Sequence, residues 1–169
     1  MTTEVLDTQA RELDLETGID RSDREKLAAH LNRALASTYV LYNKTHLFHW
    51  NVAGPLFYSV HKLTDEQYRD LAAAVDDLAE RVRSIGFPAT GGLKKMLEQS
   101  VVDDADQLSP PTRDMVALLA KDHQRIALDL RKAVKEAEKW DDVYTADLLT
   151  SRIGVHEEAA WMLQATLAD

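Results

Sequence analysis

Residues 61–80, with the sequence HKLTDEQYRDLAAAVDDLAE, contain two pairs of candidate metal ligands at helical spacing. His61 precedes Asp65 by four residues and Asp76 precedes Glu80 by four, so in a helix each pair projects from one face. The eleven residues from Asp65 to Asp76 span roughly 16 Å of helix rise, too far for both pairs to bind one metal ion within a chain. They also make about three turns, so both pairs face the same direction.

The two pairs are symmetric about a point between Asp70 and Leu71. A second copy of this helix, packed antiparallel on a two-fold axis at that point, would place the first pair of one chain opposite the second pair of the other. Two-fold dimers are the commonest oligomers, and they require such a self-complementary surface. The sequence therefore predicts two equivalent metal sites that form only when the chain dimerises.

Composition limits the classes of function. The chain has 169 residues, enough for one domain with its own core, and no cysteine, so metal ligands must be histidines and carboxylates. A net charge of -9 argues against generic binding to nucleic acids or anionic membranes. No apolar leader opens the chain and no apolar run is long enough to span a bilayer. We therefore expect a cytoplasmic protein without a membrane partner.

Apolar periodicity and helix-boundary residues predict four long helices and one long connection. A capping box at Ser22–Glu25 and the Gly54-Pro55 break delimit the first helix, and Gly86 ends the second. Two short joins make neighbouring helices antiparallel, while the long connection lets the chain cross the bundle. We predict an all-α, ferritin-like four-helix bundle with a short extra helix in that connection. The expected helices are about 22–51, 57–85, 93–97, 109–139 and 141–167, the last capped by Asp141 or Asp142.

The N-terminal segment differs in composition from the rest. Residues 1–23 carry seven acidic side chains against Arg11 and Arg21, with little apolar content. Such a segment cannot bury enough apolar surface to fold alone. We predict an acidic N-terminal arm over residues 1–21, mobile or loosely docked, and a bundle domain over residues 22–169.

A third histidine completes the candidate site. His49 ends the first helix, just before the turn, so its side chain can reach the first turns of the second helix. Two imidazoles with three carboxylates suit iron, manganese or zinc, and iron is favoured where coordination positions stay open. The predicted ligands are His49, His61 and Asp65 from one chain with Asp76 and Glu80 from the other.

Two alternatives compete with this interpretation. An intra-bundle di-iron centre would use paired Glu-x-x-His motifs, and none of the six histidines has glutamate three residues before it. Ordinary ion pairing on a helix surface could also explain the spacing, with Arg81 or Arg83 offsetting the repulsion between Asp76 and Glu80. The shared centre, the shared face and His49 together favour the metal site.

The motif His49-Trp50-Asn-Val-x-Gly54-x-x-Phe57-x-x-x-His61-x-x-x-Asp65, followed by Asp76-x-x-x-Glu80-Arg81, resembles the signature of the Dps proteins, which are mini-ferritins. Ten or more positions agree, and the resemblance covers residues 22–168. It implies that the five ligands form a ferroxidase centre between subunits of a hollow homododecamer built from two-fold dimers. It further implies an oxidoreductase that takes up Fe(II), oxidises it preferentially with hydrogen peroxide and stores ferric mineral, which protects the cell and its DNA.

The resemblance also implies acidic pores at the three-fold axes. Acidic residues near the start of the last helix, Asp141, Asp142 and Asp147, would line them, and helix capping is the alternative role for these side chains. DNA-binding members of the family often use lysine-rich arms. Here the arm is acidic and the sequence ends at Asp169 without a basic extension, so we expect no DNA binding by the arms.

Two other functions remain as alternatives. One is a nucleoid-structuring DNA-binding protein with secondary iron binding, and the other is a metal-free interaction bundle. A gel shift at low salt separates the first from an iron-storage protein, and anomalous scattering at the iron edge tests the second.

Overall fold

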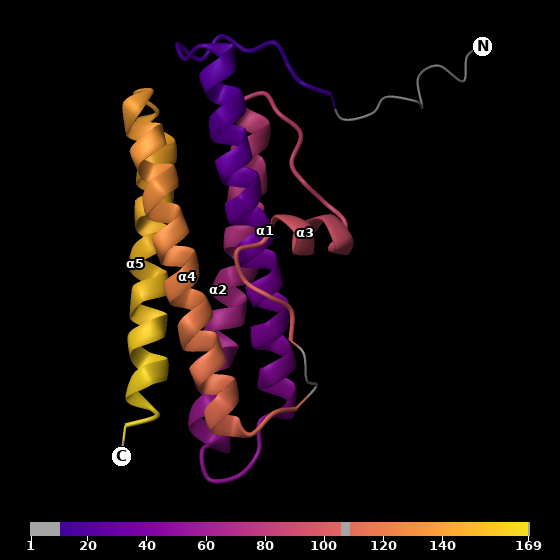
Figure 1. Ribbon diagram of the computed structural model, residues 1–169, viewed down its shortest axis with the longest axis vertical. Helices are drawn as coiled ribbons and strands as arrows, with labels where there is room; N and C mark the ends of the chain where they lie inside the picture. The colour runs from indigo at the N-terminus through magenta and orange to yellow at the C-terminus, as the bar shows by residue number, and fades with distance from the viewer. Residues whose placement is uncertain (1–10, 106–108, 169) are drawn as a thin grey trace, which may run out of the picture.

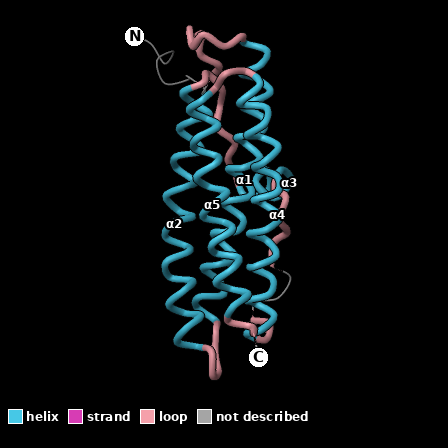
Figure 2. The backbone as a smooth tube through the Cα atoms, turned by 90° about the vertical axis from the view of Figure 1, so that its left-hand side faces the viewer, coloured by secondary structure: helices cyan, strands magenta, loops and turns pink. Residues whose placement is uncertain are grey.

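The structure, a computed structural model, describes residues 11–105 and 109–168. Four long helices lie side by side in an elongated bundle, and the short α3 packs on the outside of α1 (Figure 1). No strand occurs within the described residues (Figure 2). The all-α bundle with an extra helix in the long connection is therefore confirmed. The helices are α1 (Arg21–Asn51), α2 (Phe57–Ser84), α3 (Leu93–Gln99), α4 (Thr112–Lys139) and α5 (Val143–Ala165).

The topology consists of two antiparallel helical hairpins, α1–α2 and α4–α5, joined by a connection that crosses the length of the bundle (Figure 1). Leucines at helical spacing on α1, including Leu27, Leu31 and Leu35, are at most 1 % exposed. Each such leucine stabilises the fold by about 1.5–3 kcal/mol relative to an exposed one. None of the helices in the described part of the chain is long and apolar enough to cross a membrane.

Several predicted helix ends differ from the structure by one to three residues. The largest difference is at α4, which begins at Thr112 with Pro111 as its N-cap, so the prolines at 110 and 111 precede the helix and do not form its first turn. The capping box at Ser22 is not formed, because α1 begins one residue earlier and the backbone carbonyl of Asp20 accepts from the amides of Asp23 and Arg24, both at 3.0 Å. Glu25 instead accepts a hydrogen bond from Arg21 at 3.0 Å. The last helix ends at Ala165, two residues before the predicted end.

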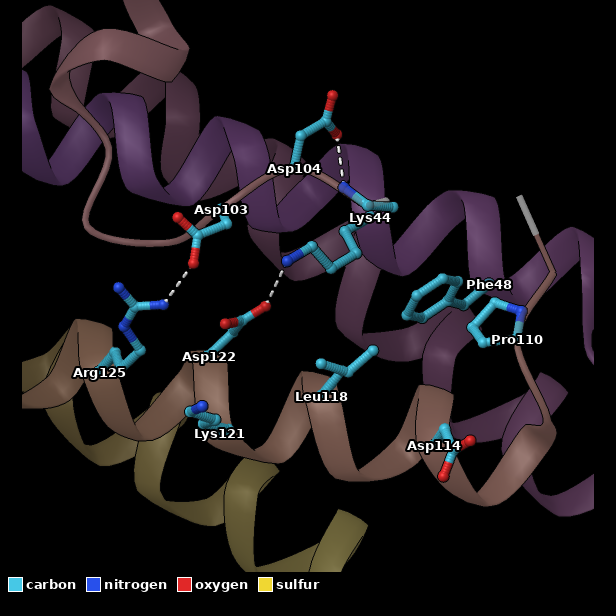
Figure 3. Close-up of a pocket in the computed structure, with 11 residues that line it drawn as sticks. Lys44, Phe48, Asp103, Asp104, Pro110, Asp114, Leu118, Lys121, Asp122 and Arg125 are labelled. Carbon is cyan, nitrogen blue, oxygen red and sulfur yellow. Dashed lines mark hydrogen bonds and ion pairs between the residues drawn. The ribbon is translucent and has the colours of Figure 1, made fainter. Parts of the chain in front are cut away.

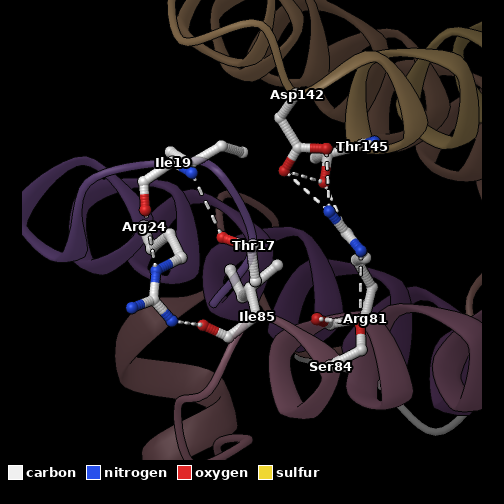
Figure 4. A network of polar contacts seen from close by, with 8 residues as sticks. All are labelled: Thr17, Ile19, Arg24, Arg81, Ser84, Ile85, Asp142 and Thr145. Carbon is white, nitrogen blue, oxygen red and sulfur yellow. Dashed lines mark hydrogen bonds and ion pairs between the residues drawn. The ribbon is translucent and has the colours of Figure 1, made fainter. Parts of the chain in front are cut away.

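Part of the predicted arm, residues 11–20, lies along the end of α2. The amide of Leu13 donates to the carbonyl of Gly86 at 2.7 Å, and the buried Arg24 guanidinium donates to the carbonyls of Ile19 and Ile85 at 3.1 and 3.0 Å (Figure 4). Gly86 has a φ of +103°, and a β-carbon there would lie 2.8 Å from the Leu13 carbonyl oxygen. This close approach therefore needs glycine. The first ten residues of the arm lie outside the described part.

A buried ion pair ties α2 to the start of α5. One Arg81 nitrogen, Nη2, donates to both oxygens of Asp142 at 2.7 Å, and Nε donates to the Thr145 hydroxyl at 2.7 Å (Figure 4). The Asp142 carboxylate also accepts from the Thr145 amide at 3.0 Å, which confirms Asp142 as the helix cap. Asp142 is only 3 % exposed, so its carboxylate stabilises the fold and does not line a pore.

Candidate metal centre

The turn between α1 and α2 brings His49 and His61 together. Their rings are stacked, with centroids 3.8 Å apart and planes 17° apart. His49 Nδ1 lies 3.0 Å from the carbonyl oxygen of His61, and His61 Nδ1 lies 3.0 Å from the carbonyl oxygen of His49. A carbonyl oxygen can only accept, so Nδ1 of each ring carries a hydrogen, which leaves Nε2 as the nitrogen through which each ring can bind a metal ion. The pair therefore presents two nitrogen atoms in the form that binds metals.

The pKa of His49 also supports the neutral form of this ring. Burial lowers the pKa of His49 below its ordinary value, and the neighbouring His61 ring lowers it further. His49 is therefore neutral at pH 7, as a metal ligand must be. Thr64 Oγ1 lies 3.3 Å from His49 Nδ1 and supports the ring from α2.

Asp65 lies one turn beyond His61 on α2, and its own helix engages both of its oxygens. The Tyr68 hydroxyl donates to Oδ1 at 2.9 Å, and Arg69 donates to Oδ1 at 3.1 Å and to Oδ2 at 3.2 Å. These bonds, first those from Arg69 and then that from Tyr68, lower the pKa of Asp65. The side chain is therefore a carboxylate at neutral pH, and a metal ion must compete with Arg69 for it.

Asp76 and Glu80 lie further along α2, where both side chains are exposed. Neither makes an ion pair or a side-chain hydrogen bond with another described residue, and Arg81 binds Asp142 instead. The ion-pair alternative for these two carboxylates therefore fails for Arg81. Arg83 donates to the carbonyls of Arg11 and Phe87 and does not contact them either.

A single chain does not assemble the complete ligand set. Within residues 11–105 and 109–168, no group of three or more histidine, cysteine, aspartate or glutamate side chains is close enough to hold a metal ion. The fold brings His49 and His61 together and leaves Asp76 and Glu80 elsewhere on α2. Completion of the site by a second subunit stays a prediction.

Sequence reasoning missed the residues around the ligands. Tyr68 and Arg69 follow Asp65 at helical spacings of three and four, which is the signal that could have identified them. The Tyr68 ring also stacks on His46, with ring centroids 4.1 Å apart. The centroids of the His46 and Trp50 rings are likewise 4.1 Å apart. An aromatic cluster therefore lies beside the histidine pair, and its Trp50 member is 64 % exposed.

Substituting Arg69 by alanine should increase the affinity of the site for divalent metal ions. Arg69 is 67 % exposed, and ion pairs of this kind are weak, so we expect about a twofold increase. Titration calorimetry of the assembled protein with Zn²⁺ measures it. Lys62→Ala is the matched control, because it removes one exposed positive charge from the same helix without contacting Asp65. An equal increase in both variants would contradict specific competition at Asp65.

Another cavity, of about 290 Å³, lies between α1, α4 and the long connection (Figure 3). At its base Lys44 Nζ lies 2.7 Å from Asp122 Oδ2, and both side chains are buried. Burial raises the pKa of Asp122, and Lys44 opposes that shift. A second pair, Arg125 with Asp103 at 2.9 Å, lies at the rim. Because these charges neutralise each other, this cavity does not compete with the histidine pair as the metal centre.

Comparison with known proteins identifies relatives along most of the chain. A family model described as a ferritin-like domain matches residues 28–169. The chain is 36 % identical over 149 residues to a low temperature-induced protein of Nostoc, which covers 88 % of this chain and 83 % of the relative. It is also 36 % identical over 137 residues to DNA protection during starvation protein 2 of Bacillus anthracis, covering 81 % and 93 %.

Solved structures agree with the sequence relatives. A Dps protein from Bacillus brevis superposes with a TM-score of 0.84 at 35 % identity, covering 89 % of this chain and all of the other. A Dps protein from Vibrio cholerae O1, described as a member of a broad superfamily of ferritin-like diiron-carboxylate proteins, gives 0.85 at 28 % identity, covering 96 % and 99 %.

Proposed function

The chain belongs to the Dps family of ferritin-like proteins, and from this membership we propose that it is an iron-sequestering ferroxidase. It oxidises Fe(II), preferentially with hydrogen peroxide, and stores the ferric product inside a hollow homododecamer in the cytoplasm. The observation that carries the proposal is the stacked pair of His49 and His61, with each Nε2 left to bind a metal ion and the Asp65 carboxylate one turn away.

The ligand set is completed by a second subunit. His49, His61 and Asp65 come from one chain, and Asp76 of the partner subunit and Glu80 of the partner subunit come from the other. One support is the spacing of the ligand pairs on α2, which is symmetric about a point between Asp70 and Leu71 and so suits an antiparallel partner helix. The other is that both carboxylates are exposed and have no ion-pair partner among the described residues. A dyad through α2 near Asp70 and Leu71 creates two such sites per dimer.

The chemistry follows from these ligands. Two Fe(II) ions give up one electron each, and one peroxide accepts both as its O–O bond breaks and its two oxygen atoms take up protons to form water. Because both electrons are delivered, no hydroxyl radical is released. The three carboxylates favour the Fe(III) product, since a higher charge binds more strongly to anionic oxygen ligands. Hydrolysis of Fe(III) then releases protons as the mineral forms.

A crystal of the assembled protein soaked with Fe(II) tests this proposal. We expect anomalous scattering at the iron edge between two-fold-related α2 helices, next to the histidine pair. Iron bound only elsewhere, or an assembly whose dyad does not pass through α2, would contradict the proposed site.

DNA protection occurs in the names of relatives. For this chain we infer that DNA is protected by removal of Fe(II) and peroxide and not by binding of the arm. The described part of the arm carries more acidic than basic residues: Glu12, Asp14, Glu16 and Asp20 against Arg11 and Arg21.

In a gel-shift assay at low salt, the assembled protein should therefore not retard linear duplex DNA in the absence of divalent ions. Size-exclusion chromatography of the same sample confirms assembly. Retardation under these conditions would favour the nucleoid-structuring alternative.

A further inference from the structure

Arg69 is held over the predicted ligand Asp65, although its side chain is 67 % exposed. Its Nε donates to Asp65 Oδ2 at 3.2 Å and its Nη2 donates to Oδ1 at 3.1 Å, which is the two-bond geometry of a guanidinium that faces a carboxylate. The guanidinium carbon also lies 5.2 Å from the centre of the Tyr68 ring, and the Tyr68 hydroxyl donates to the same carboxylate at 2.9 Å. The positive charge of Arg69 therefore has a defined place beside the candidate metal centre.

The side of the guanidinium that faces away from Asp65 keeps its donors. A guanidinium has five N–H groups, and the bonds to Asp65 use two of them. Within the described part of the chain, Arg69 donates to no other residue, and its Nη1 makes no hydrogen bond at all. A second carboxylate can therefore bind to Arg69 without displacing the first.

The proposed dyad brings such a carboxylate to the same height along the helix. Because the symmetry point lies between Asp70 and Leu71, Asp65 of one chain lies level with Asp76 of the partner subunit. The Arg69 side chain reaches back one turn to Asp65, so its guanidinium lies at this level as well. Asp76 of the same chain is seven residues in the opposite direction, roughly 10 Å of helix rise away. Positions 69 and 76 therefore meet only across the interface.

A dimer without metal needs a positive charge at this position. Each site brings together the carboxylates of Asp65, of Asp76 of the partner subunit and of Glu80 of the partner subunit, and like charges at an interface oppose association. Four basic side chains lie on α2, and within the described residues only that of Arg69 forms an ion pair with a predicted ligand. Arg69 is therefore the side chain of α2 that is placed to offset this repulsion.

We propose that Arg69 is a built-in counter-ion for the metal-free dimer, and that it bridges Asp65 of its own chain and Asp76 of the partner subunit. This inference rests on the proposed site between subunits. Arginine neutralises the interface before metal binds, and the metal ion neutralises it afterwards, when the guanidinium leaves Asp65. Assembly of the subunits then does not have to wait for iron.

Charge reversal at residue 69 tests the proposal. Arg69→Glu puts a fourth carboxylate into each site, so in EDTA at low ionic strength we expect the dissociation constant of the dimer to rise more than about tenfold. Sedimentation velocity over a dilution series measures this change. Addition of Zn²⁺ should restore assembly, because the ion supplies the positive charge that was removed. Lys135→Glu makes the same change of charge on the exposed surface of α4 and is the matched control, which should assemble like the unchanged protein.

A charge swap tests the contact with the partner subunit directly. Arg69→Glu/Asp76→Lys moves the positive charge to the other side of the interface, and we expect assembly in EDTA to recover. Circular dichroism confirms that each variant keeps its helices. The proposal would be overturned if Arg69→Glu assembled normally in EDTA, if Zn²⁺ did not restore its assembly, or if the swap assembled no better than Arg69→Glu. Iron takes no part in these measurements, so the counter-ion can fail while the iron soak confirms the ferroxidase centre.

Discussion

Replacing His61 by alanine, or Asp65 by asparagine, is expected to reduce the rate of peroxide-dependent Fe(II) oxidation more than about 100-fold. His61→Ala removes one of the two metal-binding nitrogens and keeps the backbone carbonyl of residue 61 that orients His49. Asp65→Asn keeps the shape of the side chain and removes its charge, which Fe(III) requires most. Stopped-flow absorbance of the ferric product, with Fe(II) and peroxide at fixed ratio, measures the rate.

The fold should be unaffected by either change, because both side chains are only half-buried. Size-exclusion chromatography should therefore show the same assembly for both variants. His30→Ala is the matched control. Like His61, His30 is a half-buried histidine, but it lies on α1 at roughly 28 Å of helix rise from His49. Unchanged oxidation kinetics in His61→Ala would refute the proposed centre.

Acidification from pH 7.5 to pH 5 should destabilise the fold strongly through the buried pair of His123 and His156. Burial lowers the pKa of His123 to about 3 and lowers that of His156 as well, with Arg152 contributing to both shifts and Asp70 opposing that of His123. In the unfolded chain both histidines titrate near their ordinary pKa of about 6.5. Below that pH the unfolded state therefore binds more protons than the native state, and stability falls as pH falls.

The expected loss at pH 5 is about 2 kcal/mol for each histidine. Urea denaturation at several pH values measures it. In the double variant His123→Gln/His156→Gln the contribution of this pair should disappear, and a smaller dependence from His30, His46 and His49, whose pKa values burial also lowers, should remain. Carboxylates whose pKa is lowered in the fold change the stability only at lower pH, since the ordinary pKa of aspartate is about 3.9. Equal slopes for the two proteins between pH 6.5 and 5 would contradict a neutral buried pair.

The helical architecture could be predicted from sequence because its determinants are local. The apolar period of α1, the break at Gly54-Pro55 and the cap at Asp142 each depend on residues within a few positions. The prediction of a capping box at Ser22 was wrong because it, too, relied only on local sequence. A local pattern cannot show that the Asp20 carbonyl accepts the first amides and that the helix begins one residue earlier.

The candidate site was predictable only in part. The residue types indicated which side chains could bind a metal, and their spacing indicated that they share one face of the helix. The tautomers of His49 and His61 could not be predicted, because they depend on each ring contacting the other residue's carbonyl across a turn. The contact between His123 and His156 joins residues 33 positions apart on different helices, and no periodicity encodes it. Both features depend on helix packing and side-chain rotamers.

The reciprocal histidine–carbonyl bonds link the two ends of the α1–α2 turn. Each imidazole is oriented by the main chain of the other histidine, so the segment from His49 to His61 carries its own alignment device. Grafted into the bend of an unrelated antiparallel helix pair, these thirteen residues would present two Nε2 atoms for a metal ion, with a host hydroxyl in the place of Thr64. The segment is thus a portable module for building transition-metal sites into designed proteins.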